Sequence, residues 1–250
     1  MQRIEGESFS VSIAEKGAEL LSFHSKKDGR EYIWKGDPSV WKWHAPVLFP
    51  QCGNFPDGYS FEGKTRILPM HGFLRDKEHS YLGKGRFLFS FSGTEDYPFS
   101  FDAYTTFLLE GNKLLHRVEI KNTSSLPLPC SLGFHTGYSI SSPMITFEKE
   151  ENEIGGRFFK CSDDTLFKTK LFTKISSRTF LLEGEEGKRI RISSPDFSTL
   201  VIWSPSGHSK NLVCIEPRFD TVPYGAKEPF GKTIEAGESV FLEEKIEILE

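Results

Sequence analysis

Hydrophobic and polar residues alternate with a period of two in many short segments of this chain. In FSVSIAE, residues 9–15, apolar side chains fall on one side and small or polar ones on the other, which predicts a half-buried β-strand. Turn signals at residues 16–17 and 27–30 separate it from AELLSFHSK, residues 18–26, and EYIW, residues 31–34. The beginning of the chain therefore predicts a meander of short antiparallel hairpins.

The same alternation returns through the rest of the chain, in runs bounded by Gly, Asn, Ser or Pro. These further predicted strands are FLFSFSG (87–93), FDAYTTFLLEG (101–111), KLLHRVEIKN (113–122), RTFLLEG (178–184), KRIRISS (188–194), TLVIWS (199–204) and VFLEEKIEI (240–248). Only residues 38–43 predict a short helical turn, with Asp37 as its N-cap and Pro38 in its first turn. The polar stretch from Ser141 to Lys174 is expected to be a long excursion that rims a site.

Many short strands without helix-length segments predict an antiparallel sandwich or barrel, an all-β fold with little helix. The composition agrees, because 23 Phe against 3 Met favour pleated surfaces. With 37% hydrophobic and 26% charged residues, the chain can bury a large core under an ordinary charged surface. No internal repeat is visible, and we expect a single domain over residues 1–250.

Net charge and cysteine spacing indicate which partners and which cellular compartment to expect. The formal net charge is −4 with no Lys/Arg block, so we expect no nucleic-acid partner. The first residues carry three glutamates and no apolar run, and no segment reaches membrane-spanning length, so we expect neither a signal peptide nor a membrane partner. The four cysteines are far apart, which indicates reduced thiols in a cytoplasmic protein: Cys52, Cys130, Cys161 and Cys214.

The segment LVCIEP, residues 212–217, places a carboxylate where a buried strand is expected to end. Four residues of buried-strand character lead directly into Glu216 and then Pro217. A carboxylate at such a place is costly unless it is hydrogen-bonded or used in chemistry. From spacing alone, the commoner outcome is a charge that emerges into solvent at the proline.

Two further segments carry histidines in unusual settings. In SLGFHTGYSI, His135 lies between apolar Phe134 and two small residues, although a lone histidine is more often satisfied by a backbone carbonyl. In ILPMHGFLRD, His71 precedes Arg75, whose fork of donors suits sugar hydroxyls or an anion. The plain alternative there is a turn histidine and a surface charge.

Motifs of other enzyme classes are missing from the sequence. There is no G-x-S-x-G elbow, no phosphate loop and no G-x-G-x-x-G after a strand. The remaining histidines lack the short spacing of zinc enzymes. We expect His116 to lie in a strand and the others to be mainly exposed: His24, His44, His79 and His208. We therefore expect no metal and no other cofactor.

Taken together, these segments resemble the aldose 1-epimerase family, in particular its shorter bacterial, mutarotase-like branch. The order of the motifs carries the resemblance across nearly the whole chain: GAELLSF, GREYIWKGDPSVWKWHAPVLFP, ILPMHGFLRD, SLGFH, LVCIEP and IEAGES.

The resemblance implies a galactose-mutarotase-like fold, a large antiparallel β-sandwich with a sugar on its concave face. It also implies an isomerase that interconverts the α and β anomers of an aldohexose without a metal. By motif, Glu216 matches the general base and His135 the general acid, while His71 and Arg75 match residues that hold sugar oxygens. An acid and a base suffice for ring opening, whereas a glycosidase normally needs two facing carboxylates.

The sequence departs from the family pattern at two positions. Asn54 in QCGNF stands where family members often carry arginine, and Arg218 after Glu216-Pro217 stands where an aromatic residue is common. We hypothesise that Arg218 and Arg75 together bind a phosphorylated or otherwise anionic sugar, as in hexose-6-phosphate mutarotases.

Other functions remain open from the sequence. The substrate is a small sugar or a sugar phosphate, and the oligomeric state is monomer or homodimer. A non-catalytic carbohydrate-binding or sensing protein would keep the sandwich and the pocket without turnover. A plain structural β domain remains possible only if the three motif segments fail to converge in space.

Overall fold

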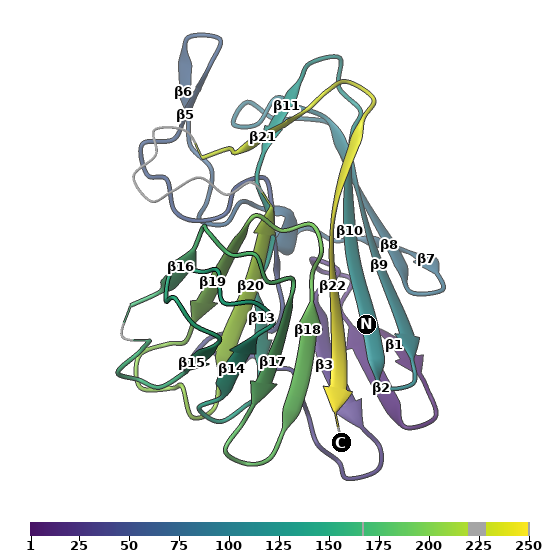
Figure 1. Ribbon diagram of the computed structural model, residues 1–250. Helices are drawn as coiled ribbons and strands as arrows, with labels where there is room; N and C mark the ends of the chain where they lie inside the picture. Colours follow the sequence, from purple (N-terminus) through teal and green to yellow (C-terminus); the bar gives the residue numbers. More distant parts are fainter. Residues whose placement is uncertain (167, 220–228, 250) are drawn as a thin grey trace.

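Strands make up nearly all the regular structure of the protein. The computed structural model describes residues 1–166, 168–219 and 229–249. Within them, the only helix is a 3₁₀ turn, η1, at Leu74–Asp76 (Figure 1). No helix in the described part of the chain is long and apolar enough to cross a membrane. The predicted all-β class with little helix is confirmed.

A nine-stranded antiparallel sheet forms one layer (Figure 1). Its strands lie in the order β15 (Phe158–Lys160), β14 (Met144–Phe147), β17 (Thr179–Glu183), β18 (Arg189–Ser193), β22 (Ser239–Leu249), β10 (Lys113–Asn122), β9 (Phe101–Glu110), β8 (Arg86–Phe91) and β7 (Ser80–Gly83). The long strands β9, β10 and β22 lie side by side at its middle.

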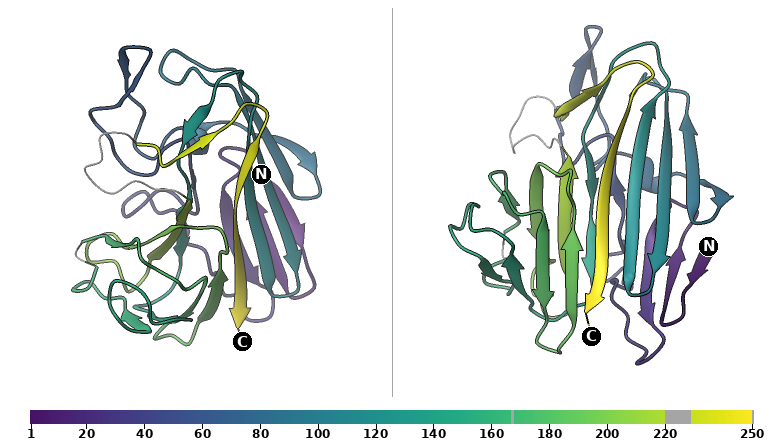
Figure 2. Two further views of the ribbon diagram at one scale, coloured as in Figure 1. Left: turned by 45° about the horizontal axis from the view of Figure 1, so that its top comes forward. Right: turned by 45° about the vertical axis from the view of Figure 1, so that its right-hand side comes forward.

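The second large sheet has six strands and carries two of the motif segments, SLGFH and LVCIEP. Its order is β16 (Lys170–Phe172), β19 (Thr199–Trp203), β20 (Val213–Phe219), β12 (Leu132–Phe134) and β4 (Val47–Leu48), with β13 (Thr136–Tyr138) also paired to β20. Smaller sheets join β1 (Gln2–Glu5), β2 (Phe9–Ile13) and β3 (Leu20–Ser25), then β5 (Tyr59–Phe61) and β6 (Lys64–Arg66), and finally β11 (Leu128–Cys130) and β21 (Lys232–Ile234) (Figure 2).

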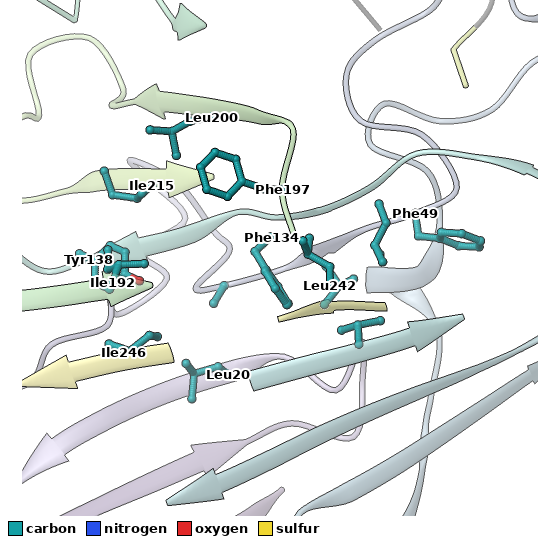
Figure 3. Packing of buried hydrophobic residues seen from close by; sticks show 14 of the residues in the cluster. Leu20, Phe49, Phe134, Tyr138, Ile192, Phe197, Leu200, Ile215, Leu242 and Ile246 are labelled. Atoms are coloured by element: carbon teal, nitrogen blue, oxygen red, sulfur yellow. The ribbon is translucent and has the colours of Figure 1, made fainter. Parts of the chain in front are cut away.

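The hydrophobic core joins the two large sheets. Alternate residues of β10 are buried and the residues between them are more exposed, as the period of a strand requires. Figure 3 shows Leu200, Ile215 and Phe134 of the six-stranded sheet in one cluster with Ile192 and Ile246 of the nine-stranded sheet. Each such aliphatic or aromatic side chain contributes roughly 1.5–3 kcal/mol when it is fully buried.

Most predicted strands are confirmed. The short turn expected within residues 38–43 is present as a single turn: the N–H groups of Val40 and Trp41 donate to the Asp37 carbonyl at 3.0 and 2.8 Å, and the Asp37 carboxylate accepts from the Ser39 N–H at 3.0 Å, as an N-cap does. The prediction that the stretch from Ser141 to Lys174 is a long excursion is wrong, because its short apolar runs contribute β14, β15 and β16 to the two large sheets. That the chain is a single domain stays a prediction.

Candidate active site

A cavity of about 510 Å³ opens beside the six-stranded sheet, within the roughly 300–1,000 Å³ that small-molecule sites occupy. All six residues that the sequence singled out line it: Asn54, His71, Arg75, His135, Glu216 and Arg218. They come from four separate segments of the chain, so the motif segments do converge in space. A neighbouring cavity of about 690 Å³ is larger, but none of the six lines it.

Glu216 lies in the middle of β20 and is 1% exposed. The expectation that the strand ends at Pro217 is wrong, because β20 continues through the proline to Phe219. Burial raises the pKa of the Glu216 carboxyl, and the charge of Arg218 opposes that rise. Arg218 donates from a guanidinium nitrogen to Oε2 of Glu216 at 2.5 Å, and this ion pair keeps a buried carboxylate compensated.

His135 occupies the single position between β12 and β13. Its backbone N–H donates to the Pro46 carbonyl at 3.1 Å, outside the pairing with β20. Its side chain points toward Glu216, with Nε2 of His135 3.3 Å from Oε1 of Glu216. Burial lowers the pKa of His135, and the positive charges of Arg218 and Arg75 lower it further.

Aromatic rings fix the orientation of the His135 imidazole. Trp41 stacks on it with ring centroids 4.8 Å apart and an interplanar angle of 27°. Trp203 and His71 meet it edge-on, with centroids 5.5 Å away in each case. The imidazole is therefore held between rings that leave it little rotational freedom.

His71 is held by a close crossing of two loops. Its backbone has a φ of 65°, and a Cβ on neighbouring Gly72 would lie 2.0 Å from the Phe49 carbonyl oxygen, so only glycine fits there. The Gly53 N–H donates to Nδ1 of His71 at 3.1 Å, which places the ring hydrogen on Nε2. Burial lowers the pKa of His71 to about 3, so the ring is a neutral hydrogen-bond donor.

Arg75 and Asn54 lie nearer the mouth of the cavity. The Arg75 guanidinium lies 4.6 Å from the Trp43 ring centroid and donates to the Met70 carbonyl at 2.8 Å. Lys42 lies 4.9 Å from the same indole centroid, and Asn54 is exposed at the edge. Arg75 and Lys42 thus present two positive charges beside one aromatic ring.

The sequence did not single out the tryptophans. Trp41, Trp43 and Trp203 all line the cavity, and Trp34 packs in a small cluster with Trp41 and Trp203. The signal was available, because three of the four tryptophans of the chain fall within residues 34–43. Tryptophan is enriched at binding surfaces, because its ring combines a large apolar area with a polar N–H.

The structure also places His79, the four cysteines and the residue types that could bind a metal. His79 was expected at the surface but is only 3% exposed, because it packs beside Phe89. All four cysteines are buried, and none of them forms a disulfide bond. No group of three or more His, Cys, Asp or Glu side chains that could hold a metal ion occurs in residues 1–166, 168–219 or 229–249.

Comparison with known proteins gives a consistent result. The sequence profile described as aldose 1-epimerase matches residues 2–240. The chromosomally encoded protein LacX of Lactococcus lactis subsp. lactis is 24% identical over 260 aligned positions, which cover 86% of each chain.

Solved structures extend the match to the fold. A galactose mutarotase-like protein from Lactobacillus casei superposes with a TM-score of 0.88 at 27% identity, and all of both chains is covered. A galactose mutarotase related enzyme from Lactobacillus acidophilus gives a TM-score of 0.88 at 21% identity, covering 100% of this chain and 97% of that one. A putative aldose 1-epimerase from Escherichia coli K12 gives 0.75 at 15% identity, with 99% and 98% covered.

Proposed function

Because the chain belongs to the aldose 1-epimerase family, we propose that it interconverts the α and β anomers of an aldohexose, with Glu216 as general base and His135 as general acid. The observation that carries this proposal is the 3.3 Å separation of His135 Nε2 and Glu216 Oε1 at the cavity. Ring opening needs a base at the anomeric hydroxyl and an acid at the ring oxygen. Both oxygens are bonded to one carbon, so an adjacent base and acid fit the reaction.

The proposed steps use only protein side chains. Glu216 takes the proton of the anomeric hydroxyl, the bond between C1 and the ring oxygen breaks, and His135 gives a proton to that oxygen. The open-chain aldehyde turns about its C1–C2 bond and presents the other face of C1. Ring closure then runs the two proton transfers in reverse and releases the other anomer.

The protonation of the pair suits this exchange. Burial raises the pKa of Glu216 and lowers that of His135, so the two values move toward one another. The lowered pKa makes the protonated His135 a stronger acid than a free imidazolium, which favours its giving a proton to the ring oxygen. The 2.5 Å contact from Arg218 supports the ionised form of Glu216 that must accept the proton.

The rest of the cavity is suited to holding a sugar. The neutral His71 offers an Nε2–H donor, and the guanidinium of Arg75 offers further donors for hydroxyl or ring oxygens. Trp41 and Trp203 supply flat apolar surface for the carbon skeleton. Glu216 is the one carboxylate among the described residues that line the cavity, which favours epimerisation over glycoside hydrolysis.

A sugar phosphate is the second candidate substrate. Lys42, Arg75 and Arg218 line the cavity against Glu216 alone, so the formal charge at the site is positive. Arg218 is only 4% exposed and is engaged by the base. An anionic group would therefore have to meet Lys42 and Arg75 at the mouth.

Polarimetry tests the proposal and separates the substrates. Freshly dissolved glucose, galactose and glucose 6-phosphate are followed with the wild-type protein and with Glu216→Gln. We expect wild type to accelerate mutarotation of at least one of them and the variant to lose that acceleration. Lys42→Gln is a matched probe, because it should weaken a preference for the phosphate and leave neutral sugars unaffected. No acceleration of any sugar would favour a non-catalytic binding protein.

A further inference from the structure

Behind the cavity, the core holds a second pair of a glutamate and a histidine. His116 of β10 and Glu244 of β22 face each other directly across two antiparallel strands. Both side chains are fully buried, and Nδ1 of His116 lies 3.1 Å from Oε1 of Glu244. The positions on either side of them on the inward face are apolar: Leu114, Val118, Leu242 and Ile246.

This inner pair contacts both residues that flank His135. The Thr136 hydroxyl donates to Oε1 of Glu244 at 2.7 Å, and the Phe134 ring lies 4.4 Å from the His116 ring, centroid to centroid. Successive side chains along an extended backbone point to opposite sides. Phe134 therefore points into the core (Figure 3), and with Thr136 it meets the nine-stranded sheet while His135 points into the cavity.

We propose that His116 and Glu244 are positioning residues that hold His135 in place for proton transfer, an inference that rests on the proposed function. His116 is itself fixed, because Phe107 of the next strand stacks on it with centroids 4.3 Å apart and an angle of 18°. The contacts run from the nine-stranded sheet through His116 and Glu244 to both neighbours of the acid. They connect the two layers of the sandwich directly behind the reacting groups.

The chemistry of the inner pair argues for a role beyond packing. Removing a carboxylate and an imidazole from water is costly, and apolar residues of similar size would fill the same space at least as favourably. A hydrogen bond from Thr136 to a buried carboxylate is directional, unlike an apolar contact. It fixes the height and rotation of β13, and hence where the adjacent imidazole of His135 lies relative to Glu216.

Thr136→Val tests this role, because it removes the hydroxyl and preserves the shape. We expect kcat for mutarotation to fall about tenfold while KM stays within about twofold, since the acid is misplaced and the sugar contacts remain. Thr136→Ser restores the hydroxyl and should restore kcat. Thr105→Val is the matched control, because Thr105 is a strand threonine, 1% exposed, whose hydroxyl has no hydrogen-bond partner in the described part of the chain.

The outcomes separate the two proposals. An inactive wild-type protein would reject the proposed function itself. An active wild type with a Thr136→Val variant that matches Thr105→Val in kcat would reject the positioning role. A loss of kcat that Thr136→Ser does not restore would also reject it. Should the valine variant not fold, the smaller Thr136→Ala is measured in its place by the same criteria.

Discussion

Two glutamate–histidine pairs lie back to back in this protein, and they differ mainly in access. Glu216 and His135 are 3.3 Å apart at the wall of a cavity. Glu244 and His116 are 3.1 Å apart and fully enclosed by the core. The same two residue types can thus serve proton transfer where a substrate can reach them and geometry where it cannot.

The third partner of each glutamate sharpens the difference. Arg218 brings a full positive charge to Glu216 at 2.5 Å, and this charge opposes the rise in the pKa of Glu216 that burial causes. Glu244 instead accepts a hydrogen bond from the Thr136 hydroxyl at 2.7 Å. This donor is neutral, and it belongs to β13, the strand that Glu244 anchors. A charged partner tunes the ionisation of the outer pair, whereas a neutral and directional one suits the inner pair as an anchor.

The largest expected effect compares the two histidines. His135→Gln removes the proposed acid and should lower kcat by about 10²–10⁴-fold, the usual contribution of a general acid or base. His116→Gln should lower kcat only about tenfold, because it disturbs His135 indirectly, through the two residues that flank it. Steady-state mutarotation of the two variants is the measurement, with circular dichroism to establish that both are folded. Similar losses in both variants would remove the distinction between the pairs.

The next effect concerns stability and the cation of the outer pair. Arg218→Met leaves the buried Glu216 carboxylate uncompensated and should cost about 3–5 kcal/mol in the free energy of unfolding at pH 7. The sign with pH follows from the raised pKa of Glu216: protonation at lower pH neutralises the orphaned charge, so the loss shrinks from pH 7 to pH 5. Urea denaturation at both pH values measures it.

Arg189→Met is the matched control for that substitution. Arg189 donates to Glu183 at 3.1 Å across two neighbouring strands, and both side chains are exposed, by 45% and 44%. An exposed pair of this kind is worth about 0–1 kcal/mol, so the variant should be nearly as stable as wild type. An equally large loss in both variants would contradict the account of Arg218.

A buried histidine that makes no ion pair with a carboxylate in the described part of the chain supplies a third case. Burial lowers the pKa of His79 to about 4, below its value in the unfolded chain, so the unfolded state binds more protons in this range. Stability should therefore fall as pH drops from about 6.5 to about 4, with roughly 3 kcal/mol due to this residue. Urea unfolding of His79→Leu should show a correspondingly flatter pH dependence, and an unchanged slope would contradict this.

The smallest expected effect is a displacement of the pH–rate profile. Only the ionised carboxylate of Glu216 can take a proton, and burial raises its pKa above 4.5. Activity should therefore fall with decreasing pH along a limb that lies above pH 4.5. Residual activity of Arg218→Met should show this limb at higher pH, because Arg218 holds the pKa down, whereas Thr136→Val should leave it in place. An acid limb at the same pH in Arg218→Met as in wild type would contradict the claim that Arg218 lowers the pKa of Glu216.

The sequence predicted the strands well because alternation is a local signal. It also contained part of the inner pair, since Glu244 falls between Leu242 and Ile246 on the inward side of an alternating run. What no local pattern reveals is that Glu244 meets His116, 128 positions earlier in the chain. That contact depends on the register of β10 against β22, which is set by the packing of the whole sheet.

The sequence predicted which residues form the site better than it predicted how they are arranged. Motif order brought Glu216, His135 and His71 together, and the structure places all three at one cavity. The passage of β20 through Pro217 was missed, because a proline usually ends a central strand. The pairing of Arg218 with Glu216 was missed as well, since residues two apart share one side of a strand and the sequence does not say which side faces the cavity.

The most direct test compares the two glutamates in one experiment. Anomeric exchange of the preferred sugar is followed at equilibrium by magnetisation transfer between its α and β anomeric protons, with wild type, Glu216→Gln and Glu244→Gln at equal concentration. We expect Glu216→Gln to fall to the uncatalysed rate and Glu244→Gln to keep exchange within about tenfold of wild type. Exchange by Glu216→Gln as fast as by wild type would contradict the assignment of Glu216 as the base.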